Sequence, residues 1–238
     1  MPNDIFERLR GKFIVLDGVD GAGKSAQLDL LHKGLENHGV EVVQTRDPGG
    51  TIIGDRIRHI LLDYDLSRMD VHCETFLFMA SRAQLASEVI RPALAEKKTC
   101  LGDRYVSATC AYQGAAGYDP KRVIDLARMA IGDNWPHLTI IIDMPPEHAF
   151  ERTSRKTQAE RKKEQRYRNR NLEGHPTLFH DVHTDAMEAR PLEFHQRVRE
   201  IFLDLPSFYP APVTIVDGTG SVEQVQQYVM EAISRAAL

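Results

Sequence analysis

The sequence predicts an α/β protein in which a five-stranded parallel sheet is flanked by helices. Short apolar runs rich in Val and Ile alternate with longer segments of helical periodicity, which is typical of βαβ units. The expected strands are 13–16, 40–44, 99–102, 138–144 and 213–216. The expected helices are 25–38, 54–62, 73–94, 122–131, 188–205 and 222–236. We expect a single domain over residues 1–238, since that length supports one sizeable core.

The composition is that of an ordinary globular protein, with 42% hydrophobic and 27% charged residues. A formal net charge of −4 argues against a general nucleic-acid binder. No apolar run approaches the ~20 residues that span a bilayer, and the charged N-terminus does not resemble a signal peptide. Cys73, Cys100 and Cys110 lack metal-like or redox-like spacing. These features favour a cytoplasmic protein with free thiols and no membrane association.

The first expected strand, 13–16, leads into a glycine-rich turn and then a helix. The pattern G-x-x-x-x-G-K-[ST] is satisfied by Gly18, Gly23, Lys24 and Ser25. The backbone N–H groups of such a turn and the following helix N-terminus bind polyphosphate. Lys24 can reach the β- and γ-phosphates, and the Ser25 hydroxyl can ligate Mg²⁺. A chance lysine after a glycine turn is the alternative, but strand, turn and helix all lie where the motif requires.

In a parallel sheet, ligands bind beyond the carboxyl ends of the strands. The second strand is followed by residues 45–51, where Pro48 and two glycines suit either a ligand-facing loop or an ordinary turn. The next helix, 54–62, places Arg58 away from its apolar face. Farther on, Phe78 and Arg82 share one helical face. They can stack on a base and hold its edge, or they are a core aromatic and a solvated arginine.

The third strand ends in Asp103 and Arg104, at the same edge as the first. A carboxylate there can hold Mg²⁺ through water and an arginine can clamp a phosphate; a structural ion pair is the alternative. Residues 111–114 are expected to form a small-residue loop in which Tyr112 and Gln113 line a sugar or base pocket. The turn 217–220 after the last strand lies against an adenine or simply connects strand to helix.

Residues 153–186 have few apolar side chains, and basic residues are concentrated between 155 and 170. We interpret this segment as a lid with a basic insertion that orders around an anionic ligand. An RNA-contacting arm and a plain charged loop are the alternatives.

Taken in order, these segments resemble the thymidylate kinase family of the nucleoside-monophosphate kinases, over nearly the whole chain. Residues 46–51 resemble its R-[ED]-P-G-G-T segment. The signature D-R-[YH]…A-Y-Q-G is matched by 103–105 with 111–114. Residues 78 and 82–84 resemble its thymine-contacting helix, and 136–139 its P-D-L-T segment. The resemblance implies the P-loop nucleoside-monophosphate kinase fold, phosphorylation of dTMP by ATP with Mg²⁺, and a homodimer.

The resemblance also implies roles for individual residues. The ATP-binding residues are Gly18, Val19, Asp20, Gly21, Ala22, Gly23, Lys24 and Ser25. The dTMP-binding residues are Asp20, Asp47, Arg58, Phe78, Arg82, Arg104, Tyr112 and Gln113. Phe78 is expected to stack on thymine, Arg82 to read its edge and Tyr112 to pack below deoxyribose. Lys24, Asp103 and Arg104 are the catalytic candidates, and Ser25 and Asp103 the Mg²⁺ ligands.

One departure from the family pattern concerns the lid, where Ala186 replaces the arginine of D-R-x-E. Arg168, Arg170 and Arg190 are candidates to substitute for it. Two other functions stay open: a kinase of another nucleoside monophosphate, and a nucleotide-binding regulator with weak or lost transfer. A GTPase is disfavoured because no Asn-Lys-x-Asp guanine reader is present.

Overall fold

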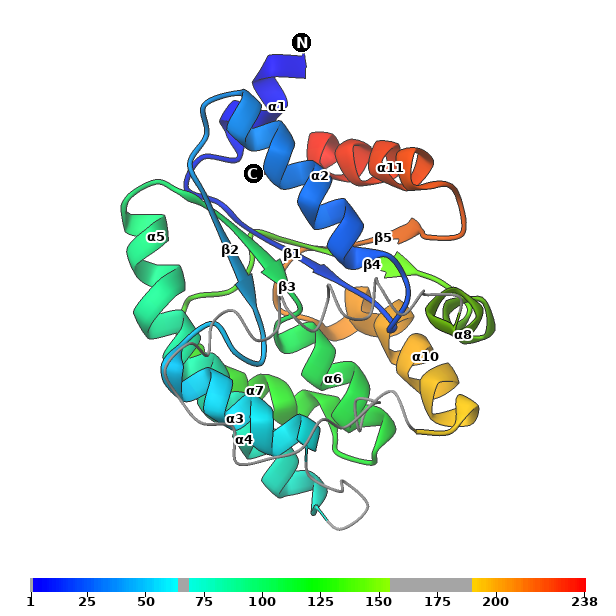
Figure 1. Cartoon of the computed structure of the whole chain (residues 1–238). Helices are drawn as coiled ribbons and strands as arrows, with labels where there is room; N and C mark the ends of the chain where they lie inside the picture. Colours follow the sequence, from blue (N-terminus) through cyan, green and yellow to red (C-terminus); the bar gives the residue numbers. More distant parts are fainter. Residues whose placement is uncertain (1, 64–68, 155–189) are drawn as a thin grey trace.

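Five parallel strands form one sheet in the order β2-β3-β1-β4-β5 (Figure 1). The computed structural model describes residues 2–63, 69–154 and 190–238. The strands are β1 (Phe13–Asp17), β2 (Val42–Arg46), β3 (Thr99–Asp103), β4 (Leu138–Asp143) and β5 (Val213–Asp217). All five predicted strands are confirmed with small shifts at their ends. The predicted α/β class with a parallel sheet is therefore confirmed.

β1 lies at the centre of the sheet and is buried along its whole length. Its residue Leu16 is in register with Asp103 of β3 and with Ile140 of β4. The carboxyl ends of these three strands therefore meet at one edge. That edge is where open α/β sheets bind their ligands.

Helices cover both faces of the sheet. Those on the first face are α1 (Pro2–Arg8), α2 (Lys24–Asn37) and α11 (Val222–Arg235). Those on the other face include α3 (Ile52–Asp63), α4 (Val71–Leu85), α6 (Val106–Ala115), α7 (Pro120–Ile131) and α10 (Leu192–Phe208) (Figure 1). Two shorter helices are α5 (Arg91–Ala95) and α8 (Pro146–Ser154). No helix within the described ranges is long and apolar enough to cross a bilayer.

The predicted helix 73–94 is interrupted. α4 ends at Leu85, a π-helical turn spans Ala86–Ile90, and α5 follows. Pro92 in the first turn of α5 lacks a backbone N–H, so a regular helix would lose one hydrogen bond there. Prolines and π-helical turns are both known causes of a break in a long helix.

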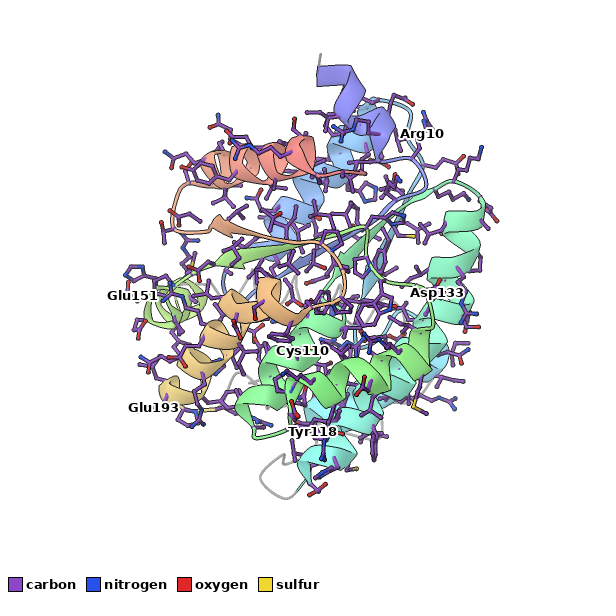
Figure 2. The ribbon with its side chains drawn as sticks, turned by 180° about the vertical axis from the view of Figure 1, so that it is seen from behind. Arg10, Cys110, Tyr118, Asp133, Glu151 and Glu193 are labelled. Atoms are coloured by element: carbon purple, nitrogen blue, oxygen red, sulfur yellow. The ribbon has the colours of Figure 1, made fainter. Side chains whose placement is uncertain are left out.

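The predicted loop at 111–114 is wrong, because these residues belong to α6. α6 lies beneath the sheet and is buried on nearly every side, and its residue Cys110 is in the interior (Figure 2). A helix that is apolar all round shows no polar face, so its periodicity was not visible in the sequence. α1 and α8 were also not predicted. The predicted lid, 153–186, lies outside the described residues apart from 153 and 154, which end α8.

Candidate active site

The glycine-rich turn follows β1 directly and runs close to β4. Gly18 has a φ of 136°, and a Cβ at this position would lie 2.4 Å from the backbone oxygen of Ile142. No residue other than glycine fits between these strands. Gly23, at the N-cap of α2, is also in the left-handed region, with a φ of 96°. The turn therefore has the backbone that the sequence motif predicts.

Lys24 begins α2 and folds back over this turn. Its Nζ donates to the carbonyl oxygens of Gly18, at 3.1 Å, and of Val19, at 2.9 Å. Nζ also lies 4.0 Å from Asp20 Oδ1. Burial lowers the pKa of Lys24, as does nearby Arg104, while the surrounding carboxylates raise it. The ammonium group is thus placed at the loop where a polyphosphate would lie.

Arg104 directly follows β3, and its side chain forms hydrogen bonds to the glycine-rich turn. It has a φ of 68°, an uncommon backbone conformation that is concentrated at functional sites. Its NH1 donates to Asp17 Oδ1 and to the Gly18 carbonyl oxygen, each at 3.0 Å. Its NH2 donates to Asp20 and, at 3.2 Å, to the hydroxyl of Tyr112. The guanidinium is therefore oriented from several directions before any ligand binds.

Two carboxylates balance these cations. Asp17 is fully buried; burial raises its pKa, while Arg104 and the hydroxyl of Ser107, which donates at 2.6 Å, oppose that rise. Burial also raises the pKa of Asp20, but Arg104 and Lys24 outweigh it and hold that pKa below its usual range. Asp20 is accordingly an anion at neutral pH. A phosphate entering this cluster would compete with Asp20 for both cations.

Three predicted site residues with buried polar groups come from α6 and from the loop after β2. Tyr112 donates its hydroxyl to Asp20 Oδ2 at 2.7 Å. Both polar atoms of the Gln113 amide, and Oδ1 of Asp47, are buried without a hydrogen-bond partner. Buried polar groups in native proteins are normally paired. These orphaned atoms are the kind that a bound nucleotide would satisfy.

Arg82 does not match the alternative of a solvated arginine. Its side chain is 1% exposed, and Nε donates to Asp47 Oδ2 at 2.5 Å. NH2 donates to the Tyr105 carbonyl oxygen, at 3.1 Å, and to Thr109 Oγ1, at 2.9 Å. Phe78, one turn earlier on α4, is half-buried and packs against the core. The two residues lie on one helix as predicted, and the contact of either with a base stays a prediction.

The remaining predicted site residues lie around this edge of the sheet. Arg58 NH1 donates to the Pro48 carbonyl oxygen at 2.8 Å, which holds the loop after β2. Asp103 is half-buried beside Leu16, and Ser25 is exposed in the first turn of α2. Among the described residues, no three His, Cys, Asp or Glu side chains form a metal cluster. Mg²⁺ that enters with a nucleotide needs only one or two protein oxygens in addition to the phosphates.

The turn after β5 is closed by its own hydrogen bonds. Asp217 Oδ1 accepts from the backbone N–H of Thr219 at 2.8 Å. Arg152 of α8 donates to the carbonyl oxygens of Gly218, Thr219 and Gly220. These contacts account for the turn without a ligand, so its position against an adenine stays a prediction.

Sequence reasoning missed Asp17 and Ser107. Asp17 is the last residue of β1, and a carboxylate at the end of an apolar strand is a signal that was available. Ser107 lies within α6, whose helix was not predicted. Both residues orient Arg104, directly or through Asp17.

A phosphate-binding turn after the central strand of a parallel sheet, facing an arginine and a lysine, defines a P-loop phosphotransferase. A family model described as thymidylate kinase matches residues 16–175. The chain belongs to the thymidylate kinase family.

Individual relatives agree with this assignment. The chain is 38% identical over 222 residues to a thymidylate kinase of Nitratidesulfovibrio vulgaris, with 93% of this chain and 95% of the relative covered. It is 39% identical over 224 residues to one of Desulfosudis oleivorans, with 94% and 96% covered. The crystal structure of thymidylate kinase from Ehrlichia chaffeensis matches with a TM-score of 0.65 at 25% identity. That match covers 94% of this chain and 99% of the other.

Proposed function

We propose that this protein transfers the γ-phosphoryl group of ATP to dTMP, forming ADP and dTDP. The observation that supports this most directly is that Lys24 and Arg104 both pair with the same carboxylate oxygen, Oδ1 of Asp20. One cation belongs to the turn for the donor phosphates, and the other comes from the end of β3. Two anionic nucleotides can therefore meet end to end over the turn.

The reaction needs alignment and charge neutralisation more than proton transfer. A monophosphate oxygen is already an anionic nucleophile near neutral pH, so no general base is required. Lys24 and the amides of the turn hold the donor phosphates, and Arg104 grips the acceptor phosphate. Cations placed in this way stabilise the charge that spreads over the transferring group. Mg²⁺, held by Ser25 and through water by Asp103, would neutralise the β- and γ-phosphate oxygens.

The acceptor pocket lies between α4, α6 and the loop after β2. Phe78 stacks on thymine, and the unpaired amide of Gln113 meets a polar edge of the nucleoside. Tyr112, fixed by Asp20, packs below the sugar where a 2′-hydroxyl would clash. Asp47 and Arg82 support the base side as a buried ion pair. Arg58 holds the intervening loop.

We further propose that the protein is a homodimer. α3 and α4 pack together, and both present large apolar side chains to solvent. Those side chains are Ile52, Ile53 and Ile60 of α3 and Phe76 of α4. Exposed apolar side chains on two packed helices suit a protein interaction site. Sedimentation of the wild type and of an Ile53→Glu variant would test the assignment, and an unchanged dimer in the variant would contradict it.

The activity is tested with purified protein, ATP, Mg²⁺ and a panel of monophosphates that includes dTMP, dUMP and ribonucleotides. dTMP is expected to be converted fastest. Lys24→Ala should abolish turnover, whereas Lys33→Ala, an exposed lysine on the same helix, should leave it unchanged. Phe78→Ala should mainly raise KM for dTMP. Absence of dTDP from the wild-type reaction would refute the proposal.

A further inference from the structure

An ion pair between Glu74 and Arg190 joins α4 to the short segment before α10. Glu74 lies on α4 one turn before Phe78, and its side chain is 3% exposed. NH2 of Arg190 donates to Glu74 Oε1 at 2.9 Å. A carboxylate buried to this degree is rarely found without a partner. Arg190 is thus bound to α4, the helix on which Phe78 also lies.

The same arginine begins a stack that ends in the phosphate site. The Arg190 guanidinium lies over the ring of Phe194, 4.5 Å from its centroid. Phe194 in turn contacts Tyr112, with ring centroids 6.3 Å apart and the planes tilted by 59°. Tyr112 also contacts the Arg104 guanidinium, which lies 5.0 Å from the ring centroid. Cation–π and aromatic contacts of this kind are each stabilising, so the stack favours a single arrangement.

Phe194 lies in the first turn of α10, where it is 4% exposed and has the Arg190 guanidinium over its ring. Pro191 is the N-cap and provides no side-chain hydrogen bond to the first turn. Figure 2 shows the neighbouring Glu193 at this outer end of the helix. Phe202, the other aromatic against Tyr112, lies farther along the helix and is 1% exposed. Both aromatics are therefore packed in the core, and Phe194 is the one that also contacts the Arg190 guanidinium.

We propose that Glu74 and Arg190 are positioning residues that set the preference for a deoxyribose acceptor. They press Phe194 against Tyr112 and so hold the Tyr112 ring close to the sugar. This inference rests on the proposed function, because it assumes that the acceptor sugar lies on Tyr112. It assigns Arg190 to the acceptor side of the site, whereas the sequence suggested it as a replacement for the lid arginine.

The test compares two acceptors, dTMP and its ribose analogue 5-methyluridine 5′-monophosphate. Arg190→Met keeps the length of the side chain and removes its charge. We expect the ratio of kcat/KM for dTMP to that for the ribose analogue to fall about fivefold or more, with KM for ATP unchanged. Glu74→Gln should give a similar fall, and the double variant no further one. Arg190→Lys should restore much of the ratio, since an ammonium can also pair with Glu74.

The matched control is Arg235→Met on α11, which breaks an exposed pair with Glu231 of the same 2.9 Å length. It should leave the ratio unchanged. An Arg190→Met enzyme with equal losses for both acceptors, or singles whose effects multiply in the double variant, would overturn the proposal. If the wild type makes no dTDP, the proposed function fails instead. Calorimetric affinities for the two monophosphates, in wild type and Arg190→Met, would still decide whether the pair sets the sugar preference.

Discussion

The guanidinium of Arg82 and the carboxylate of Asp47 form an ion pair that is closed off from solvent, with side chains 1% and 0% exposed. Burial raises the pKa of Asp47, and Arg82 opposes that rise. Asp47→Ala would leave a buried guanidinium uncompensated, so we expect the free energy of unfolding to fall by about 3–5 kcal/mol. Urea denaturation measures this difference. The control Asp125→Ala breaks an exposed pair with Arg128 and should cost at most about 1 kcal/mol; equal losses would contradict the prediction.

Gly18 is expected to tolerate no side chain. Its φ of 136° alone costs a non-glycine residue about 1–3 kcal/mol, and a Cβ would collide with the backbone oxygen of Ile142. Gly18→Ala should therefore lower the free energy of unfolding by more than the φ cost alone, and it should raise KM for ATP. Gly39→Ala is the matched control, because φ is also positive there but no atom lies within 4 Å of the added carbon. If both variants behaved alike in thermal unfolding, the close approach to β4 would have no energetic role.

Tyr112→Phe removes a single hydroxyl that donates to Asp20 at 2.7 Å. A hydrogen bond to a charged group is worth about 1.5–3 kcal/mol, and part of it is recovered because Arg104 still pairs with Asp20. We expect KM for dTMP to rise about 3- to 10-fold and KM for ATP to change little. Steady-state kinetics decide the matter, with Tyr228→Phe on the surface of α11 as the control. A selective effect on ATP would place Tyr112 on the donor side instead.

His137 should make stability depend on pH near neutrality. Its Nδ1 accepts the backbone N–H of Phe13 at 3.0 Å, and burial, with a smaller contribution from Lys12, lowers its pKa below 6.5. The unfolded chain therefore binds the proton more readily than the folded one. Neutral His137 therefore stabilises the folded state. This stabilisation is fully present above pH 6.5 and is lost as the pH falls from 6.5 through the pKa of the folded protein.

The measurement is the free energy of unfolding at about pH 7.5 and about pH 5.5. His137→Gln keeps an acceptor at this position and removes the titration. The loss of stability on acidification should be smaller in this variant than in the wild type. An identical loss in both proteins would assign the pH dependence to other groups.

The sequence was informative where a local pattern determines the structure. The five strands and the phosphate-binding turn follow from short apolar runs and from glycines at fixed spacing. The helix α6 was missed because its buried small residues give no periodic signal. Tyr112 and Gln113 are nevertheless predicted as site residues, both from the residue types in 111–114 and from the family resemblance, and the structure places both on α6.

Ion pairs between residues far apart in the sequence could not be predicted from local sequence patterns. Arg82 meets Asp47 across 35 positions, and Arg190 meets Glu74 across 116. Such contacts depend on how α4, α6 and α10 pack, which no local pattern reports. For the same reason the sequence leaves a solvated Arg82 open as an alternative, although its side chain is only 1% exposed in the structure.

The central place of β1 separates the phosphate-binding turn from the parts of the sheet that open most easily. Strand β5 has a single neighbour, and fraying there exposes one side of β4 and neither side of β1. Transient opening in proteins begins at such borders, while interior strands open only with the whole fold. The phosphate-binding turn can thus keep its conformation while the edge strands open locally. The enzyme therefore stays able to bind ATP until the whole domain unfolds.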